Sequence, residues 1–132
     1  MAEKLQFILV EDDSDDAQLF AECFQPSGHH LKIITGGDQV LPYISALNKL
    51  PDMIVLDINL PKKNGVEILT ELKAHQWFSL IPVVVLTTSD FQRNDCLKLK
   101  ALKYYIKPMS LQEMQQIVDE IVQLATSGKR LS

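Results

Sequence analysis

A chain of 132 residues suffices for one compact domain, and its 46% hydrophobic and 23% charged residues exclude a disordered chain. Seventeen acidic and 13 basic residues give a net charge of -4, which disfavours binding to nucleic acid because no Lys/Arg run compensates locally. Cys23 and Cys96 form neither a CxxC pair nor a zinc-finger spacing, so we predict no disulfide framework and no zinc site.

The N-terminal segment leads directly into a short apolar run that contains Gln6. It lacks the charged start, the long apolar stretch and the cleavage site of a signal peptide. No apolar segment approaches the about 18 residues that span a bilayer. We therefore expect a soluble protein of a reducing compartment, located in the cytoplasm and without a membrane partner.

Short apolar runs alternate with longer segments of helical periodicity. The short runs are rich in β-branched and aromatic residues, which predicts strands at Leu5–Val10, Leu31–Thr35, Met53–Asp57, Val83–Thr87 and Tyr104–Ile106. The longer segments predict helices at roughly Ser14–Gln25, Asp38–Asn48, Asn64–Gln76, Asp90–Leu102 and Ser110–Ala125. Asp90 is expected to cap its helix, and Ser110 is followed by Glu113 in the spacing of a capping box.

This alternation predicts the α/β class, with a single doubly wound, five-stranded parallel sheet and helices on both faces. Three runs are continuously apolar, which is typical of central strands that are covered on both sides. The second run carries Lys32 and the fifth run is short, as edge strands tend to be. With right-handed crossovers, the strand order 2-1-3-4-5 satisfies these assignments.

Polar side chains follow four of the five predicted strands where each strand ends. Because the carboxyl ends of parallel strands meet at one edge of a sheet, a ligand site is expected there. The residues at this edge are Glu11, Asp12 and Asp13 after the first strand, Asp57 and Asn59 after the third, Thr87, Thr88 and Ser89 after the fourth, and Lys107 after the fifth.

The acidic residues at this edge conflict electrostatically, because clustered carboxylates raise the pKa of one another. A divalent cation removes this conflict, and Mg²⁺ prefers hard oxygen ligands together with a phosphate. Lys107 is a natural counter-charge that could hold a phosphoryl oxygen, and Thr87 could donate a hydrogen bond to the same oxygens. The residues therefore predict a magnesium and phosphoryl site.

Four motifs follow one another along the chain: Phe7-Ile-Leu-Val-Glu-Asp-Asp13, Val55-Leu-Asp-Ile-Asn-Leu-Pro61 with Gly65, Pro82-Val-Val-Val-Leu-Thr-Thr88, and Tyr104-Tyr-Ile-Lys-Pro108. Together, in this order, they resemble the receiver domain of two-component response regulators. The resemblance extends from about Leu5 to Ala125 and implies the flavodoxin-like, or CheY-like, fold. We expect one receiver domain over residues 1–132, standing alone without an output domain.

The resemblance also implies a role for each residue of the site. Asp57 would accept a phosphoryl group from a phosphohistidine of a histidine kinase or a histidine phosphotransfer protein. Magnesium would be bound directly by Asp12 and Asp57, through water by Glu11, and by the backbone carbonyl of Asn59. The phosphoryl oxygens would be contacted by Thr87, Lys107 and the backbone N–H of Thr88. The chain would then be a signalling phosphoacceptor that catalyses its own phosphorylation and dephosphorylation.

The resemblance places Tyr104 at an aromatic switch position, where the ring often turns inward once the hydroxyl of the threonine, here Thr87, shifts toward the phosphate. We expect phosphorylation to be read by an unknown downstream protein on the last helix–strand–helix face, near Tyr104, Met109 and Leu111. In this family the bond between Lys107 and Pro108 is often cis. The segment before Tyr104 lacks the glycine that the family usually carries.

Two other functions remain open at this point. A Mg²⁺-dependent aspartyl phosphohydrolase would also place an Asp at a strand end, but it usually carries a second Asp where this chain has Asn59. A flavin-binding module could use the same architecture, but Glu11, Asp12 and Asp13 would repel its phosphate in the absence of a metal.

Overall fold

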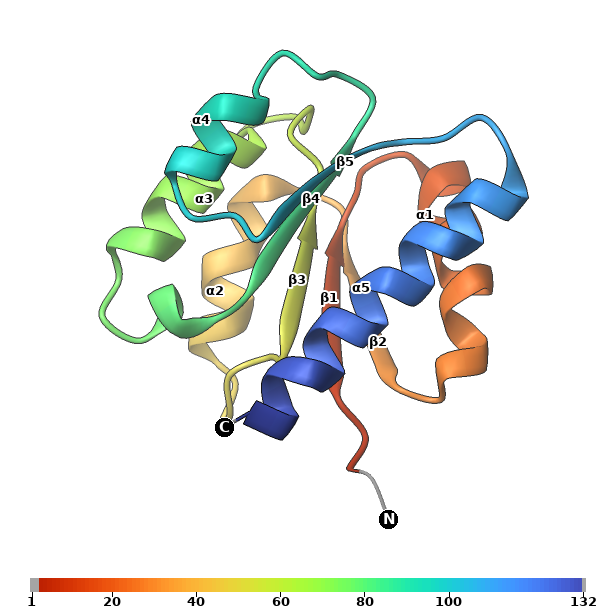
Figure 1. Cartoon of the computed structure of the whole chain (residues 1–132). Coiled ribbons are helices and arrows are strands. Elements are labelled where there is room, and N and C mark those ends of the chain that lie inside the picture. Colours follow the sequence, from red (N-terminus) through yellow and green to blue (C-terminus); the bar gives the residue numbers. More distant parts are fainter. Residues whose placement is uncertain (1–2, 132) are drawn as a thin grey trace.

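The computed structural model describes residues 3–131, and the side chains of residues 3–128. Its five strands form one parallel sheet in the order β2-β1-β3-β4-β5, which confirms the predicted class and strand order (Figure 1). The strands are β1 (Gln6–Val10), β2 (His30–Ile34), β3 (Met53–Leu56), β4 (Val83–Thr87) and β5 (Lys103–Ile106). Each lies within a residue or two of its predicted bounds.

Helices cover both faces of the sheet. On one face lie α1 (Ser14–Phe24) and α5 (Leu111–Leu131), and on the other lie α2 (Val40–Ser45), α3 (Gly65–Ala74) and α4 (Arg93–Lys98) (Figure 1). Short 3-10 turns complete the chain at Gln25–Ser27, Gly37–Gln39 and Phe78–Leu80. The chain therefore folds as three layers, with the sheet between two layers of helices.

Side chains of the central strands alternate between two apolar cores. From β3, Met53 and Val55 pack with the residues of α1 and α5, whereas Ile54 and Leu56 pack with those of α2 and α3. All four are fully buried. The continuous apolar run at this strand is explained by burial on both faces, as predicted.

The helix starts are explained by local polar side chains. Asp13 caps α1, because its Oδ1 accepts a hydrogen bond of 2.9 Å from the backbone N–H of Asp16. The predicted capping box is confirmed at α5, where Ser110 Oγ accepts from the N–H of Glu113 at 3.1 Å and bonds its side chain at 3.2 Å.

The prediction that Asp90 caps its helix is wrong. The helix α4 begins only at Arg93, and Asp90 instead accepts a hydrogen bond of 2.6 Å from the Arg93 guanidinium. The intervening residues form a turn in which Ser89 Oγ accepts from the N–H of Phe91. This turn and the left-handed backbone at Lys100 (φ 76°) confine α4 to six residues.

Within the part of the chain that the structure describes, none of the helices has the length and apolar character needed to cross a membrane.

Candidate functional site

The carboxyl ends of four strands bring the predicted site residues to one edge of the sheet. Asp57 directly follows β3, and its backbone N–H donates to the carbonyl of Val10 in β1 at 3.1 Å. Lys107 directly follows β5, and its N–H donates to the carbonyl of Thr87 at 2.7 Å. The hydrogen bonds of the sheet therefore continue into the site and fix the backbone of both residues.

Gly65 also positions Asp57. A Cβ atom at Gly65 would lie 2.4 Å from the carbonyl oxygen of Asp57, which is closer than atoms can approach. The absence of a side chain allows the start of α3 to pack directly against the loop that follows β3. The glycine N–H donates to the carbonyl of Ile58 at 2.9 Å in the same contact.

Three carboxylates form the acidic part of the site. Oxygen atoms of Glu11, Asp12 and Asp57 all lie within 4.8 Å of one another. Glu11 and Asp57 are buried, whereas Asp12 is exposed. Burial raises the pKa of Glu11 to about 7, and the charge of Asp57 adds to this effect although Lys107 and the N–H of Asp13 oppose it.

These carboxylates fit a divalent cation. They supply hard oxygen ligands from two neighbouring strand ends, and one of them is open to solvent. Their negative charges repel one another, and a bound cation would neutralise this repulsion. The fold thus brings together the three carboxylates predicted for the metal.

Lys107 lies among three carboxylates at the buried side of the site. Its Nζ lies 2.6 Å from Glu11 Oε1, 2.8 Å from Asp16 Oδ2 and 2.9 Å from Asp57 Oδ2. Burial acts to lower the pKa of Lys107, but the hydrogen bonds to these carboxylates outweigh burial and hold the pKa above its ordinary value. The lysine is therefore a fixed ammonium ion beside Asp57.

Asn59 connects the third and fourth strand ends. Its backbone N–H donates to Asp57 Oδ1 at 3.0 Å, and its side-chain amide donates weakly to the hydroxyl oxygens of Thr87 (3.4 Å) and Thr88 (3.5 Å). Thr87 is fully buried, whereas Thr88 is exposed. Both oxygens of Asp57 thus have a donor, one from Asn59 and one from Lys107.

Tyr104 points into the molecule. Its ring is buried, its hydroxyl donates to the carbonyl of Ser89, and the Arg93 guanidinium lies 5.0 Å from the ring centre. Arg93 also donates to the carbonyl of Tyr104 at 3.1 Å. Met109 and Leu111, at the face predicted to read the signal, are exposed.

Two features differ from what the sequence suggested. The bond between Lys107 and Pro108 is trans, and not the cis bond that the resemblance brought into consideration. Asp16, in the first turn of α1, is not among the residues predicted for the site, yet its carboxylate lies 2.8 Å from Lys107 Nζ. The first turn is also where acids stabilise a helix dipole, so the pattern could not separate the two roles.

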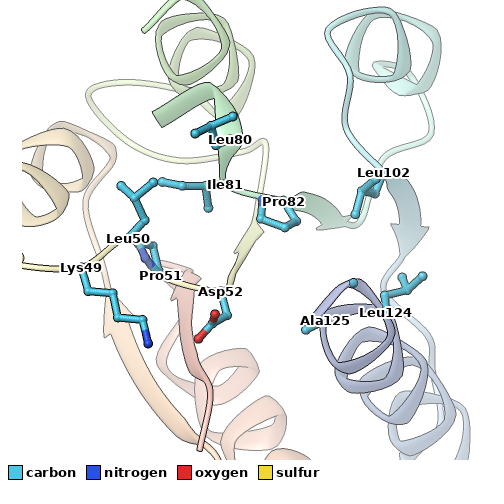
Figure 2. A pocket seen from close by; sticks show the side chains of 11 residues that line it. Lys49, Leu50, Pro51, Asp52, Leu80, Ile81, Pro82, Leu102, Leu124 and Ala125 are labelled. Carbon is cyan, nitrogen blue, oxygen red and sulfur yellow. The ribbon is translucent and has the colours of Figure 1, made fainter. Parts of the chain in front are cut away.

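A pocket of about 480 Å³ lies elsewhere, at the amino ends of β3 and β4 (Figure 2). Apolar side chains such as Leu50, Pro82 and Leu124 line it. Its carboxylate, Asp52, accepts a hydrogen bond of 2.8 Å from the N–H of Gln6. This pocket is thus at the opposite end of the sheet from Glu11, Asp12 and Asp57, and its lining does not include that group of carboxylates.

Comparisons with known proteins find relatives of this chain. A family model for the response regulator receiver domain matches residues 7–119. The probable methanogenesis regulatory protein FilR2 of Methanothrix harundinacea is 34% identical over 122 residues, or 86% of this chain and 79% of that protein. Response regulator Rcp1 of Synechocystis is 34% identical over 124 residues, or 86% of this chain and 84% of that protein.

Two solved structures have nearly the same fold. The phosphorylated cyanobacterial phytochrome response regulator RcpA superimposes with a TM-score of 0.88 at 32% identity, and the match covers 96% of each chain. The Mn²⁺-bound form of Rcp1 gives a TM-score of 0.80 at 32% identity and covers 89% of this chain and 91% of that one.

Proposed function

The chain belongs to the response regulator receiver family, the signalling phosphoacceptors of two-component systems, and from this membership we propose that Asp57 is its phosphorylated residue. The observation that carries the proposal is the position of the Asp57 carboxylate. It is buried at the end of β3, within 2.9 Å of the Lys107 ammonium and beside the carboxylates of Glu11 and Asp12.

Receiver domains bind divalent metals, and for this chain we propose Mg²⁺. Rcp1, its relative, has been solved with Mn²⁺. The carboxylates of Asp12 and Asp57 would hold the ion directly, Glu11 would act through water, and Asn59 would offer its backbone carbonyl. When bound, the cation neutralises negative charge on the oxygens of the transferred phosphoryl group.

The proposed reaction is a phosphoryl transfer from a phosphohistidine. A P–O bond forms to a carboxylate oxygen of Asp57 while the P–N bond breaks, and the electron pair of that bond returns to the imidazole nitrogen. The histidine would belong to a histidine kinase or a phosphotransfer protein, with which receiver domains interact. The product is an acyl phosphate on Asp57, and attack of water on phosphorus would later release inorganic phosphate and restore the carboxylate.

Residues of this chain contribute alignment and charge. The N–H of Asn59 and the Lys107 ammonium hold the two oxygens of Asp57, which orients the nucleophile for attack. Thr87 and Lys107 would then contact the phosphoryl oxygens, together with the N–H of Thr88. Because these groups come from the chain itself, we propose that it catalyses its own phosphorylation and dephosphorylation.

We also propose that the signal is read beside Tyr104. A shift of the Thr87 hydroxyl toward the phosphoryl group would change the packing around the Tyr104 ring. The exposed residues Met109 and Leu111 offer an apolar surface nearby for a downstream protein. In the structure the Tyr104 side chain points inward, where its hydroxyl donates to the carbonyl of Ser89 and the Arg93 guanidinium lies over its ring.

Intact-mass analysis tests the assignment of Asp57. After exposure to acetyl phosphate, we expect the chain to gain one phosphoryl group with Mg²⁺ and none with a chelator. The variant Asp57→Asn should gain none, whereas Asp38→Asn, at an exposed carboxylate outside the site, should react as the parent does. Undiminished labelling of Asp57→Asn would place the phosphoryl group elsewhere.

A further inference from the structure

Lys107 has a third carboxylate partner that the proposed chemistry does not use. An ammonium group has three N–H donors, and here one each reaches Glu11, Asp57 and Asp16. We propose that Asp16 is a positioning residue of the site, which anchors Lys107 while the other two carboxylates are engaged in phosphoryl transfer. This inference rests on the function proposed above.

Asp16 differs from the other two partners of Lys107. Glu11 and Asp57 belong to the group of carboxylates that could hold a cation, and Asp16 does not. The side chains of Glu11 and Asp57 are 4% and 6% exposed, whereas that of Asp16 is 40% exposed. Asp16 therefore remains available to the ammonium when the proposed reaction occupies Asp57 and changes the surroundings of Glu11.

The position of the Asp16 carboxylate is fixed by α1. Its backbone N–H donates to the capping side chain of Asp13 at 2.9 Å, so it lies in a hydrogen-bonded first turn. The next turn is held against the sheet by the buried residues Ala17 and Phe20. A carboxylate on this helix can hold the flexible lysine side chain at 2.8 Å and restrict its rotamers.

The consequence concerns the phosphorylated state. Lys107 must exchange its bond to Asp57 for bonds to phosphoryl oxygens, and the bond to Asp16 can persist through this exchange. Without that bond the ammonium keeps a donor that only water satisfies, and the lysine has more conformations to lose. We expect replacement of Asp16 to slow phosphorylation by acetyl phosphate about three- to tenfold.

The negative charge of Asp16 is expected to affect the phosphorylation rate in the opposite direction from its contact with Lys107. Removal of a negative charge near the site favours the approach of an anionic phosphodonor. Asp15 supplies the matched control, because it is the adjacent acid in the same turn, is exposed, and makes no hydrogen bond or ion pair with Lys107 in the described part of the chain. Asp15→Asn therefore reports the effect of charge, and Asp16→Asn reports charge together with the lost contact.

The test compares Asp16→Asn, Asp16→Glu and Asp15→Asn with the parent chain. The first readout is the NMR signal of the Lys107 ammonium in metal-free protein, assigned by its loss in Lys107→Arg. We expect this signal to broaden through faster proton exchange in Asp16→Asn and to persist in Asp15→Asn. The second readout is the phosphorylation rate with Mg²⁺, which should fall in Asp16→Asn, stay or rise in Asp15→Asn, and recover in part in Asp16→Glu.

Each result bears on one proposal. If Asp16→Asn retains the ammonium signal and is phosphorylated as fast as Asp15→Asn, the positioning role of Asp16 is refuted. If the parent chain itself gains no phosphoryl group with Mg²⁺, the proposed function fails, and the ammonium signal still shows whether Asp16 holds Lys107. A rate loss of equal size in Asp15→Asn would assign the effect to charge and would also refute the proposal.

Discussion

The buried carboxylates of Glu11 and Asp57 are tolerated because Lys107 lies between them. Breaking a buried ion pair leaves an uncompensated charge and is strongly destabilising. The ammonium contacts both carboxylates within 2.9 Å and has Asp16 as its third partner. Since Asp12 adds a further negative charge at the surface, acids still outnumber the lysine, and this surplus is what attracts a divalent cation.

Asp12→Asn tests this electrostatic balance. In chelator we expect the variant to be at least as stable as the parent, because one of three mutually repelling carboxylates is gone. Mg²⁺ at ten times its Kd should stabilise the parent by about 1.4 kcal/mol by mass action. Asp12→Asn should lose most of this increment. Thermal unfolding with and without Mg²⁺ measures both effects, and an unchanged increment would exclude Asp12 as a ligand.

The two cysteines are predicted to be inert in the folded chain. Both are buried, and burial raises the pKa of Cys96 to about 11, with a contribution from the charge of Asp95. The thiolate reacts and the thiol does not, so at pH 8 only about 0.1% of this group would be reactive even if it were accessible. A thiol reagent should modify Cys23 and Cys96 only in denaturant, and rapid modification of the native protein would contradict the burial.

Residues that follow strands could be identified from the sequence, and the contact of Asp16 with Lys107 could not. Asp57 and Lys107 stand out because each ends an apolar run at the same edge of the sheet. The salt bridge between Asp16 and Lys107 joins residues 91 positions apart. It depends on the exact packing of α1 beside the end of β5, which neither hydrophobic periodicity nor strand order specifies.

At the scale of elements, two glycines have opposite surroundings, one in a tightly packed loop and one in an open part of a helix. Gly37 precedes α2 and is buried, and a Cβ atom there would lie 2.0 Å from the carbonyl oxygen of Lys63. The loop after β2 can therefore pack directly on the loop that precedes α3. Gly128 lies in the last part of α5, where a Cβ atom would meet nothing within 4 Å.

The same substitution should have opposite effects at these positions. Gly37→Ala should destabilise the chain by about 1–3 kcal/mol, because the backbone of one loop must move. Gly128→Ala should stabilise it by about 0.5 kcal/mol, because alanine restricts the unfolded chain and favours a helix. Denaturant unfolding of both variants measures the difference, and a stable Gly37→Ala would show that the two loops can separate at little cost.

Sequence patterns identified the elements more reliably than their ends. The apolar stripe of the last helix predicted α5, but the helix continues past Ala125 to Leu131. The expected helix from Asp90 shortens to Arg93–Lys98, because polar groups before it form a turn instead of a cap. Both errors concern mostly polar segments, whose conformation depends on local hydrogen bonds and not on hydrophobic periodicity.

At the scale of the whole molecule, burial is distributed unevenly over the sheet. The central strands β3 and β4 are buried at every position, whereas the edge strands β2 and β5 each have one buried residue and are otherwise exposed or half-buried. The α4 helix has six residues, of which only Cys96 is buried. The proposed signalling face around β5 and α4 is therefore built on the less buried side of the molecule.

This distribution predicts an order of local opening. Amide hydrogen exchange should be slowest in β3 and β4, with protection near the free energy of global unfolding. It should be fastest, among the regular elements, in α4, which is too short to be stable as an isolated helix and contributes one buried side chain. Exchange followed by mass spectrometry, with denaturant unfolding to set the upper limit, measures this order. Equal protection of α4 and β3 would mean that the molecule opens only as a whole, and a switch at Tyr104 would then require a change in the entire sheet.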